Sequence, residues 1–332
     1  MAEALTIGTF TVDVIAVDLP RIAKPGEVVY VTRPIDLHVG GHAANVSVDL
    51  VKLGIIHNVV AGGALGRDVF AHLIEHELKK YGIIVAAETI DNVGTARNMI
   101  LVVRGEDRRF HVYRGANQHL SAEHVIRLIN KYKPRYLYIS IGASRKLDDQ
   151  IDKVLSHAKS IGSTVLVDIA YTEPKAVKIL DRILNLPDII HLNTEELRML
   201  TNEEDVVKAF GLLRDRTPIL LCVTSGEKGV IALYKSKILI EQPPFKVELR
   251  DPTGAGDACC AGILSALKLS GKPLAELNVN ELAKVLMFAQ ASGAVAVTAP
   301  GATTAVSSIN VRRLIESQGV NIIAKTKITN LY

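Results

Sequence analysis

Between residues 121 and 224 the sequence alternates four times between a helical segment and a short apolar run. The helical segments span residues 122–132, 148–160, 174–184 and 205–214, and the apolar runs span 136–141, 164–168, 189–192 and 219–224. The runs are rich in Val, Ile and Leu, which is typical of strands that are covered on both faces. Helices alternating with such strands predict an α/β fold, with a central, mostly parallel sheet covered by helices on both faces.

The flanking segments extend the same pattern. We expect strands at residues 4–9 and 58–61, helices at 42–53 and 68–81, an antiparallel edge hairpin at 230–234 and 237–240, and long helices beginning near residues 255 and 280. Residues 322–328 alternate weakly and are interpreted as an additional edge strand. Since no repeat or linker composition divides the chain, we expect one domain over residues 1–332.

A second group of β-rich runs is expected to lie outside the main body. Residues 97–104 and 109–114 flank a hairpin-type turn at residues 105–107. Together with residues 12–17 and 28–37, these runs predict a small separate sheet.

Composition argues against several classes of partner. The 332 residues are 48% hydrophobic and 22% charged, so the chain can bury a sizeable core. The net charge of +4 is spread along the sequence, and pairs such as Arg108-Arg109 are interpreted as solvated. This pattern argues against a nucleic acid or a membrane as partner.

The cysteines and the apolar segments indicate a compartment. The three cysteines, at positions 222, 259 and 260, lack metal-ligand spacing, and their odd number argues against a disulfide framework. The N-terminus has no signal-peptide pattern, and residues 282–299 are interpreted as a buried helix instead of a membrane span. We therefore expect a cytoplasmic protein.

The run Asp251-Pro-Thr-Gly-Ala-Gly-Asp257 carries the strongest indication of chemistry. An apolar stretch with helical spacing follows it, so the run predicts a helix start. Backbone N–H groups there lack intrahelical partners and favour negative charge, so the turn can hold a phosphoryl group. An aspartate would repel phosphate unless it takes a proton from the attacking hydroxyl, which predicts Asp257 as a general base. The alternative is an ordinary first-turn acid.

A second glycine motif, Gly40-Gly-His-Ala-Ala-Asn45, lies earlier in the chain. In this order and spacing, the two motifs resemble the signatures of the ribokinase-like carbohydrate kinases, the phosphofructokinase-B family. The resemblance extends from about residue 7 to residue 313. It implies a ribokinase-like fold, in which segments 12–38 and 95–115 form a small β-sheet lid. It also implies ATP and Mg²⁺ as cofactors, a small-molecule substrate and a homodimer formed through the lid sheet. The chain has no P-loop pattern.

The resemblance assigns roles to particular residues. Asp257 activates the acceptor hydroxyl, and the N–H groups of Gly254, Ala255 and Gly256 stabilise the transferred phosphoryl group. The implied acceptor-binding residues, which combine close backbone approach with polar side chains, are Asp13, Gly40, Gly41 and Asn45. A surface carboxylate and a helix-surface amide are the structural alternatives for Asp13 and Asn45. His42 either caps its helix or contacts substrate.

Two further motifs resemble the nucleotide and metal sites of the family. Asn193-Thr-Glu-Glu196 implies magnesium held by Glu196 through water, or else a helix N-cap at Asn193. The run 224–229 resembles a nucleotide loop. The implied nucleotide-binding residues are Asn193, Thr224, Gly226, Gly229, Thr253, Gly254, Gly256 and Gly301. Asp251 and the carbonyl of Thr253 are implied ligands of a monovalent cation such as potassium, or else Asp251 only orders the turn.

The class of acceptor stays open. A ribose-like pentose or ketose, phosphorylated on a hydroxymethyl group, is the first hypothesis, and a nucleoside is the second. A phosphosugar or sugar acid is the third, because Arg97, Arg109 and Arg114 could bind its anionic group, although arginines in such strands are also ordinary exposed residues. The alternative to an enzyme is a non-catalytic sugar- or nucleotide-binding protein on the same fold. The intact Asp257 and its glycine turn argue against this alternative.

Overall fold

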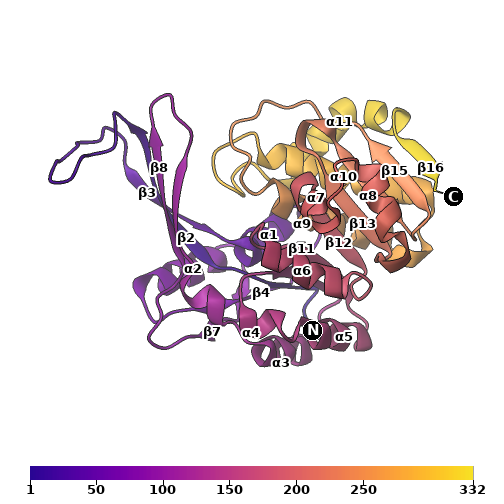
Figure 1. Cartoon of the computed structure of the whole chain (residues 1–332), viewed down its shortest axis with the longest axis horizontal. Coiled ribbons are helices and arrows are strands. Elements are labelled where there is room, and N and C mark those ends of the chain that lie inside the picture. Colours follow the sequence, from indigo (N-terminus) through magenta and orange to yellow (C-terminus); the bar gives the residue numbers. More distant parts are fainter. Residues whose placement is uncertain (332) are drawn as a thin grey trace.

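The computed structural model describes residues 1–331 and is built around a ten-stranded sheet (Figure 1). Its strand order is β16-β15-β14-β13-β12-β11-β10-β1-β4-β6. Neighbouring strands from β6 to β13 pair in parallel, and β14, β15 and β16 add antiparallel strands at one edge. The strands are β1 (Ala4–Ile7), β4 (Val59–Gly62), β6 (Ile84–Val85), β10 (Tyr136–Ile141), β11 (Thr164–Ile169), β12 (Ile189–Asn193), β13 (Leu220–Thr224), β14 (Val230–Tyr234), β15 (Ile238–Gln242) and β16 (Lys327–Asn330).

Helices cover both faces of this sheet, because alternate residues of each strand point into opposite layers. In β10, Tyr136 and Tyr138 belong to one hydrophobic layer, whereas Leu137 and Ile139 belong to the other. The helices of the first layer are α1 (His42–Lys52), α2 (Val69–Lys79), α9 (Ala255–Ser270), α10 (Val279–Ala296) and α11 (Ser308–Ala324). Those of the second are α3 (Ala122–Tyr132), α4 (Arg145–Asp148), α5 (Ile151–Ser160), α6 (Pro174–Ile183), α7 (Thr194–Thr201) and α8 (Val206–Leu213).

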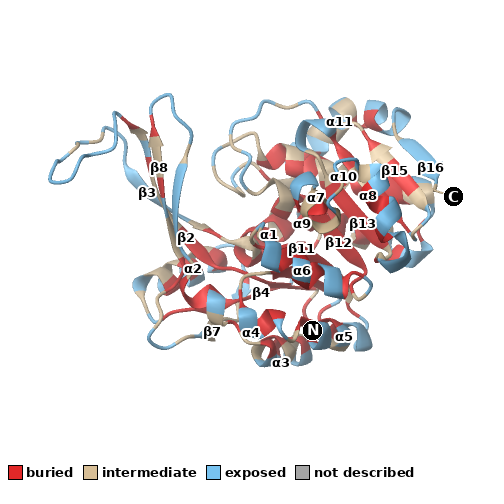
Figure 2. Ribbon diagram, in the orientation of Figure 1, coloured by how far each residue is buried: buried red, intermediate tan, exposed pale blue. Residues whose placement is uncertain are grey.

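A four-stranded sheet with the order β3-β2-β8-β9 projects from the main body as a lid (Figure 1). Its strands are β2 (Thr11–Leu19), β3 (Ile35–Gly40), β8 (Arg97–Val103) and β9 (Arg109–Tyr113). Figure 2 shows that the lid is far more exposed than the central sheet. Its outer face carries exposed apolar side chains such as Leu37 and Met99. Dimerisation through this sheet stays a prediction.

The remaining elements are short. A two-stranded sheet pairs β5 (Ala64–Leu65) with β7 (Glu88–Thr89). The 3-10 turns are η1 (Gly115–His119), η2 (Arg214–Arg216), η3 (Gly226–Lys228) and η4 (Leu274–Glu276). Within the described residues, none of the helices combines the length and hydropathy that a membrane span needs.

Three expected elements differ from the structure. Residues 28–34 form no strand, because Pro34 cannot donate to a strand ladder and pairing begins only at Ile35. The expected helix 148–160 begins only at Ile151, because Gln150 lies outside helical geometry at φ −123°, and the short helix α4 ends before it at Asp148. In the run 322–328, α11 continues to Ala324, and the edge strand is confined to β16.

Asp49, in α1, is a buried carboxyl without a compensating partner. It is fully buried, and neither of its oxygens has a hydrogen-bond partner among the described residues. Burial raises its pKa well above the ordinary value; the charge of Asp257 adds to this shift and Lys52 opposes it. The folded protein therefore keeps a proton that the unfolded chain releases near pH 4, about the ordinary pKa of aspartate.

We predict that Asp49→Asn flattens the pH dependence of stability. In the wild type, the stabilisation from the bound proton is complete below about pH 4 and is lost as the pH rises toward the raised pKa, by at most about 1.4 kcal/mol per pH unit. Asparagine has no such proton. Urea unfolding between pH 5 and pH 8 should therefore show a smaller fall in unfolding free energy for the variant. Equal falls in both proteins would contradict the assignment.

Candidate active site

A cavity of about 920 Å³ lies between the inner face of the lid and the main body. Its wall is formed by lid strands, by the first turn of α1, by the loop before α9 and by the loop after α10. The predicted site residues that line it are Asp13, Gly40, Gly41, Asn45, Asp251, Thr253, Gly254, Asp257 and Gly301. The two glycine motifs, about 200 residues apart in sequence, thus meet in one cavity.

Asp257, in the first turn of α9, has one engaged and one free carboxylate oxygen. Oδ2 accepts a hydrogen bond of 2.8 Å from Nδ2 of Asn45, and Oδ1 has no hydrogen-bond partner among the described residues. The side chain is buried, and burial raises its pKa, against the opposing influence of His42 and Asn45. A cavity-lining carboxylate with a free oxygen and a raised pKa is suited to accept a proton from a hydroxyl.

The turn before Asp257 presents backbone N–H groups at a helix start, of which the Ala255 amide makes a long hydrogen bond of 3.4 Å to the carbonyl oxygen of Pro252. Gly254 is the N-cap of α9 at φ 81°, and no side chain caps this helix. A Cβ atom on Gly254 would lie 2.7 Å from Cα of Ala302, so only glycine fits here without strain. The first amides of a helix have no intrahelical acceptor, and together with the helix dipole they favour an anion. We call the segment Gly254–Gly256 the anion turn.

Polar groups at the other end of the cavity come from the lid and from α1. Oδ1 of Asp13, on β2, accepts a 2.7 Å hydrogen bond from Nδ2 of Asn98, on β8. Gly40 adjoins both this carboxylate and Asn45, since a Cβ atom there would lie 3.2 Å from Oδ2 of Asp13 and 3.9 Å from Oδ1 of Asn45. Burial raises the pKa of Asp13, while Asn98 and His38 oppose the shift. Sequence analysis missed Asn98, which its pairing with β2 places beside Asp13.

His42, the first residue of α1, also lines the cavity. Its ring Nδ1 is 3.1 Å from Oγ1 of Thr9, and its backbone N–H donates to the same hydroxyl at 3.0 Å. Ligand atoms of His42, Asp168 and Asp257 all lie within 4.8 Å of one another. His42 therefore contributes to the surroundings of Asp257 as well as to the start of α1.

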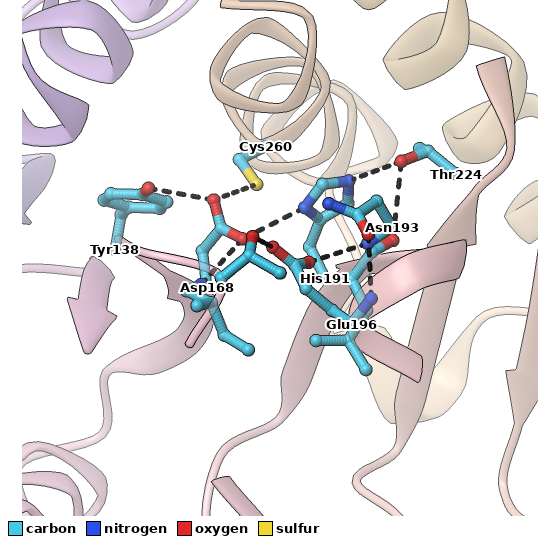
Figure 3. A network of polar contacts seen from close by, with 10 residues as sticks. Tyr138, Asp168, His191, Asn193, Glu196, Thr224 and Cys260 are labelled. Carbon is cyan, nitrogen blue, oxygen red and sulfur yellow. Dashed lines mark hydrogen bonds and ion pairs between the residues drawn. The ribbon is translucent and has the colours of Figure 1, made fainter. Parts of the chain in front are cut away.

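A buried polar network at the ends of β11, β12 and β13 lies behind the anion turn (Figure 3). His191 joins two of its members, with Nδ1 3.2 Å from Oδ1 of Asp168 and Nε2 3.2 Å from Oγ1 of Thr224. Burial would lower the pKa of His191, but the carboxylate of Asp168 outweighs burial and raises it well above the ordinary value. A Cβ atom on Gly256 would lie 3.3 Å from Cε1 of His191, so the charged ring packs against the anion turn. Asp168 also accepts a hydrogen bond of 3.1 Å from the hydroxyl of Tyr138.

Asn193 and Glu196 adjoin this network and cap α7. Oδ1 of Asn193 accepts from the Glu196 amide at 2.9 Å, and Oε2 of Glu196 accepts from the Asn193 amide at 2.8 Å. The N-cap alternative is therefore present in the structure. Burial raises the pKa of Glu196, and the charge of Asp168 adds to the shift. Oε1 of Glu196 also accepts a hydrogen bond of 2.8 Å from the hydroxyl of Thr172, so both oxygens of this carboxylate face protein donors. This arrangement does not fit a direct bond to magnesium, and contact through water, which magnesium usually retains, stays a prediction.

Several predicted nucleotide residues lie outside the lining of the cavity. Asn193 and Thr224 face each other at the carboxyl ends of two parallel strands. Gly226 and Gly229 follow in the next loop, with φ of 52° and 92°. Strand pairing thus brings Asn193 and Thr224 together, with Gly226 and Gly229 in the loop that follows Thr224.

Comparison with known proteins assigns the family. The sequence profile of the pfkB family carbohydrate kinases matches residues 1–309. The chain belongs to this family. A fructokinase of Klebsiella pneumoniae is 30% identical over 80% of this chain and 88% of its own, and a ribokinase of Haemophilus influenzae is 28% identical over 92% and 96%. The solved ribokinase of Thermotoga maritima superposes with a TM-score of 0.78 at 22% identity, covering 95% of this chain and all of that one.

The protein is therefore a phosphotransferase acting on a carbohydrate hydroxyl, with a ribokinase-like fold and a separate lid sheet. A second solved relative, from Escherichia coli and assigned as a ribokinase II, was determined in complex with ATP and Mg²⁺; it has a TM-score of 0.76 at 21% identity over 96% of this chain and all of its own.

The three lid arginines that were predicted to bind substrate contact other protein side chains instead. Their contacts are Arg97 with the rings of Phe70 and Tyr113, Arg109 with Glu106, and Arg114 with Glu173 and the ring of Tyr171. None of the three is among the described residues that line the cavity, so their role in substrate binding stays a prediction. Arg108 lines it instead. The interpretation of Arg108 as solvated is wrong, because its side chain is only 30% exposed and is bonded to the main body.

Asp251 orders the loop before the anion turn. Its Oδ1 accepts hydrogen bonds from the amide and the hydroxyl of Thr253, at 3.0 and 2.6 Å, and its Oδ2 accepts from the Gly301 amide at 3.0 Å. Both oxygens therefore already face protein donors, which does not fit a cation ligand in this arrangement. Potassium binding stays a prediction, and we derive no step from it.

We predict that Gly254→Ala damages phosphoryl transfer through the anion turn. The added methyl group meets Ala302 and a left-handed backbone, so the turn must move and misplace its N–H groups. We expect kcat to fall by roughly 100-fold, as for the loss of an oxyanion donor. Gly271→Ala is the matched control, because Gly271 ends the same helix at φ 67° and its added Cβ meets nothing within 4 Å. Equal losses of kcat in the two variants would show that backbone strain alone is responsible.

Proposed function

We propose that this carbohydrate kinase transfers the γ-phosphoryl group of ATP to a hydroxymethyl group of a small ribose-like pentose or ketose. The observation that carries the proposal is the row of Asp13, Asn98, Asn45 and Asp257 along one cavity, joined pairwise by hydrogen bonds. Carboxylate and amide groups pair with the hydroxyls of a neutral polyol. The Asp13 carboxylate would repel an anionic sugar, which disfavours a phosphosugar or sugar acid.

The free oxygen of Asp257 supplies the base. An acceptor hydroxyl bonded to Oδ1 gives up its proton to this oxygen as its own oxygen attacks the γ-phosphorus of ATP. The bond between the γ-phosphorus and the bridging oxygen breaks, and ADP leaves with that electron pair. The N–H groups of the anion turn stabilise the charge on the transferred group. The lid covers the reacting atoms and limits attack by water.

The relative solved with ATP and Mg²⁺ supports the same nucleotide and cation here. Magnesium, when bound, neutralises phosphate charge and orients the nucleotide. Glu196 is the carboxylate that would hold it, through a water molecule. Asn193 and Thr224, at the adjoining strand ends, would contact the nucleotide phosphates.

A nucleoside is the second candidate, and the inner face of the lid favours it. Ile15, Ile100, Phe110 and Val112 line the cavity beside the polar row. Such an apolar wall suits a flat aromatic base better than a free sugar, which would leave it facing water.

The test is ADP release from Mg²⁺-ATP across a panel of acceptors. The panel contains ribose, fructose and related free sugars, purine and pyrimidine nucleosides, sugar acids and phosphosugars. We expect the highest kcat/KM for a free pentose or ketose. Highest kcat/KM for a nucleoside would establish the second candidate, and for an anionic sugar it would contradict both. Absence of turnover, with measurable binding of a sugar or nucleoside by calorimetry, would favour a non-catalytic binding protein.

A further inference from the structure

Lys52, the last residue of α1, bonds to the loop that follows α10. Its ammonium group donates hydrogen bonds to the backbone carbonyl oxygens of Thr303 and, at 3.1 Å, of Thr304, more than 250 positions later in the sequence. The side chain of Lys52 is half-buried. Thr303 and Thr304 line the cavity, whereas Lys52 is not among the described lining residues. Lys52 therefore acts on the cavity through this loop.

The preceding part of the same loop packs against the anion turn. Gly301 donates its backbone N–H to Oδ2 of Asp251 at 3.0 Å. A Cβ atom on Gly254 would lie 2.4 Å from the carbonyl oxygen of Ala302, so the loop touches the anion turn there. The loop is thus held on one side of Ala302 by a carboxylate and on the other by the ammonium of Lys52. A shift of the loop would disturb the N–H groups of the anion turn.

The contacts of Lys52 are of the kind that a monovalent cation makes. Backbone carbonyl oxygens bind potassium by replacing its water shell, and a lysine ammonium is likewise a compact point charge of +1. Here the ammonium takes two carbonyl oxygens of the loop. Both oxygens of Asp251, the carboxylate predicted to bind a cation, already accept from protein donors. The loop therefore receives the charge of a monovalent cation from a covalently attached group.

We propose that Lys52 is a positioning residue that holds this loop against the anion turn in place of a bound monovalent cation. The proposal rests on the proposed phosphoryl transfer, and it departs from the cation site that the family resemblance implies at Asp251 and Thr253. Lys52 contacts neither acceptor nor nucleotide and exchanges no proton; it acts by fixing Ala302 beside Gly254. Because the ammonium is part of α1, phosphoryl transfer needs no potassium.

The test compares the wild type with Lys52→Met, which keeps a long side chain but removes the charge. Lys52→Arg is the conservative variant, and Lys79→Met is the matched control, because Lys79 is the exposed last residue of α2. The first readout is kcat for the best acceptor of the panel, in potassium, ammonium or tetramethylammonium chloride. The second needs no acceptor: the calorimetric affinity for Mg²⁺-ADP with aluminium fluoride, a mimic of the transferred group, in the same salts. Urea unfolding measures the stability of each variant.

We expect kcat and affinity of the wild type to differ by less than about threefold among the salts. Lys52→Met should lower kcat by roughly tenfold or more, because small misplacements around the transferred group are costly, and should lower affinity for the aluminium fluoride complex by a similar factor. Potassium or ammonium ions should restore part of both losses, whereas tetramethylammonium, which is larger and donates no hydrogen bond, should not. Lys52→Arg should retain most activity, and Lys79→Met should behave as the wild type.

Two results would overturn the proposal. A wild-type kcat or affinity that rises more than about threefold when potassium replaces tetramethylammonium would mean that a bound cation still holds the loop. A lower unfolding free energy as the only change in Lys52→Met, or no change at all, would mean that Lys52 does not position the anion turn. If the wild type phosphorylates no acceptor, the proposed function fails, but the affinities in the three salts still decide the role of Lys52.

Discussion

The hydrogen bond between Asn45 and Asp257 joins the two halves of the active site. Asn45 lies in the first turn of α1 and Asp257 in the first turn of α9, and both helices begin at a glycine with positive φ, Gly41 and Gly254. Each glycine lets another segment approach its backbone closely: an added Cβ would lie 2.5 Å from the carbonyl oxygen of Thr9 at Gly41 and 2.4 Å from that of Ala302 at Gly254. In the proposed function, this contact aligns the end of the cavity that would hold the acceptor with the end that would hold the phosphoryl group.

Charge around this contact is balanced by the buried pair Asp168 and His191, which does not line the cavity, and by His42, which does. Asp168 is completely enclosed, and burial alone would disfavour its ionisation, but His191 and His42 outweigh burial and lower its pKa. His191 stays charged in turn because Asp168 is ionised. The pair keeps a positive ring against Gly256, behind the turn that would hold a phosphoryl group, without placing a free cation in the cavity.

Local sequence patterns predicted the layers of the fold, whereas the joint role of the two glycine motifs was implied by the family resemblance. Runs of Val, Ile and Leu between helices indicate a parallel sheet, and its topology gathers the strand ends that carry Asn193 and Thr224. Predictions failed where a tertiary contact decides. Neighbouring arginines in the lid hairpin look alike in sequence, but only packing reveals that Arg108 reaches Asp251 while Arg109 pairs with Glu106.

Buried polar residues were missed for a similar reason. Asp49 has the spacing of an ordinary helix acid, and its burial depends on α9 packing against α1. Asp168 and His191 each interrupt an apolar run by one position, a signal that could have marked them as buried and paired. Which residue each would pair with depends on the order of strands in the sheet.

The most direct test of the account is Asp257→Asn, which keeps the shape of the side chain and its contact with Asn45 but removes the base. We expect kcat to fall by roughly 1000-fold, with affinities for acceptor and ATP changed less than about threefold. In the wild type, kcat should fall as the pH drops through the raised pKa of Asp257, because the base must be ionised. A variant that retains most of its kcat, or that loses acceptor affinity in proportion to its activity, would contradict the assignment of Asp257 as the catalytic base.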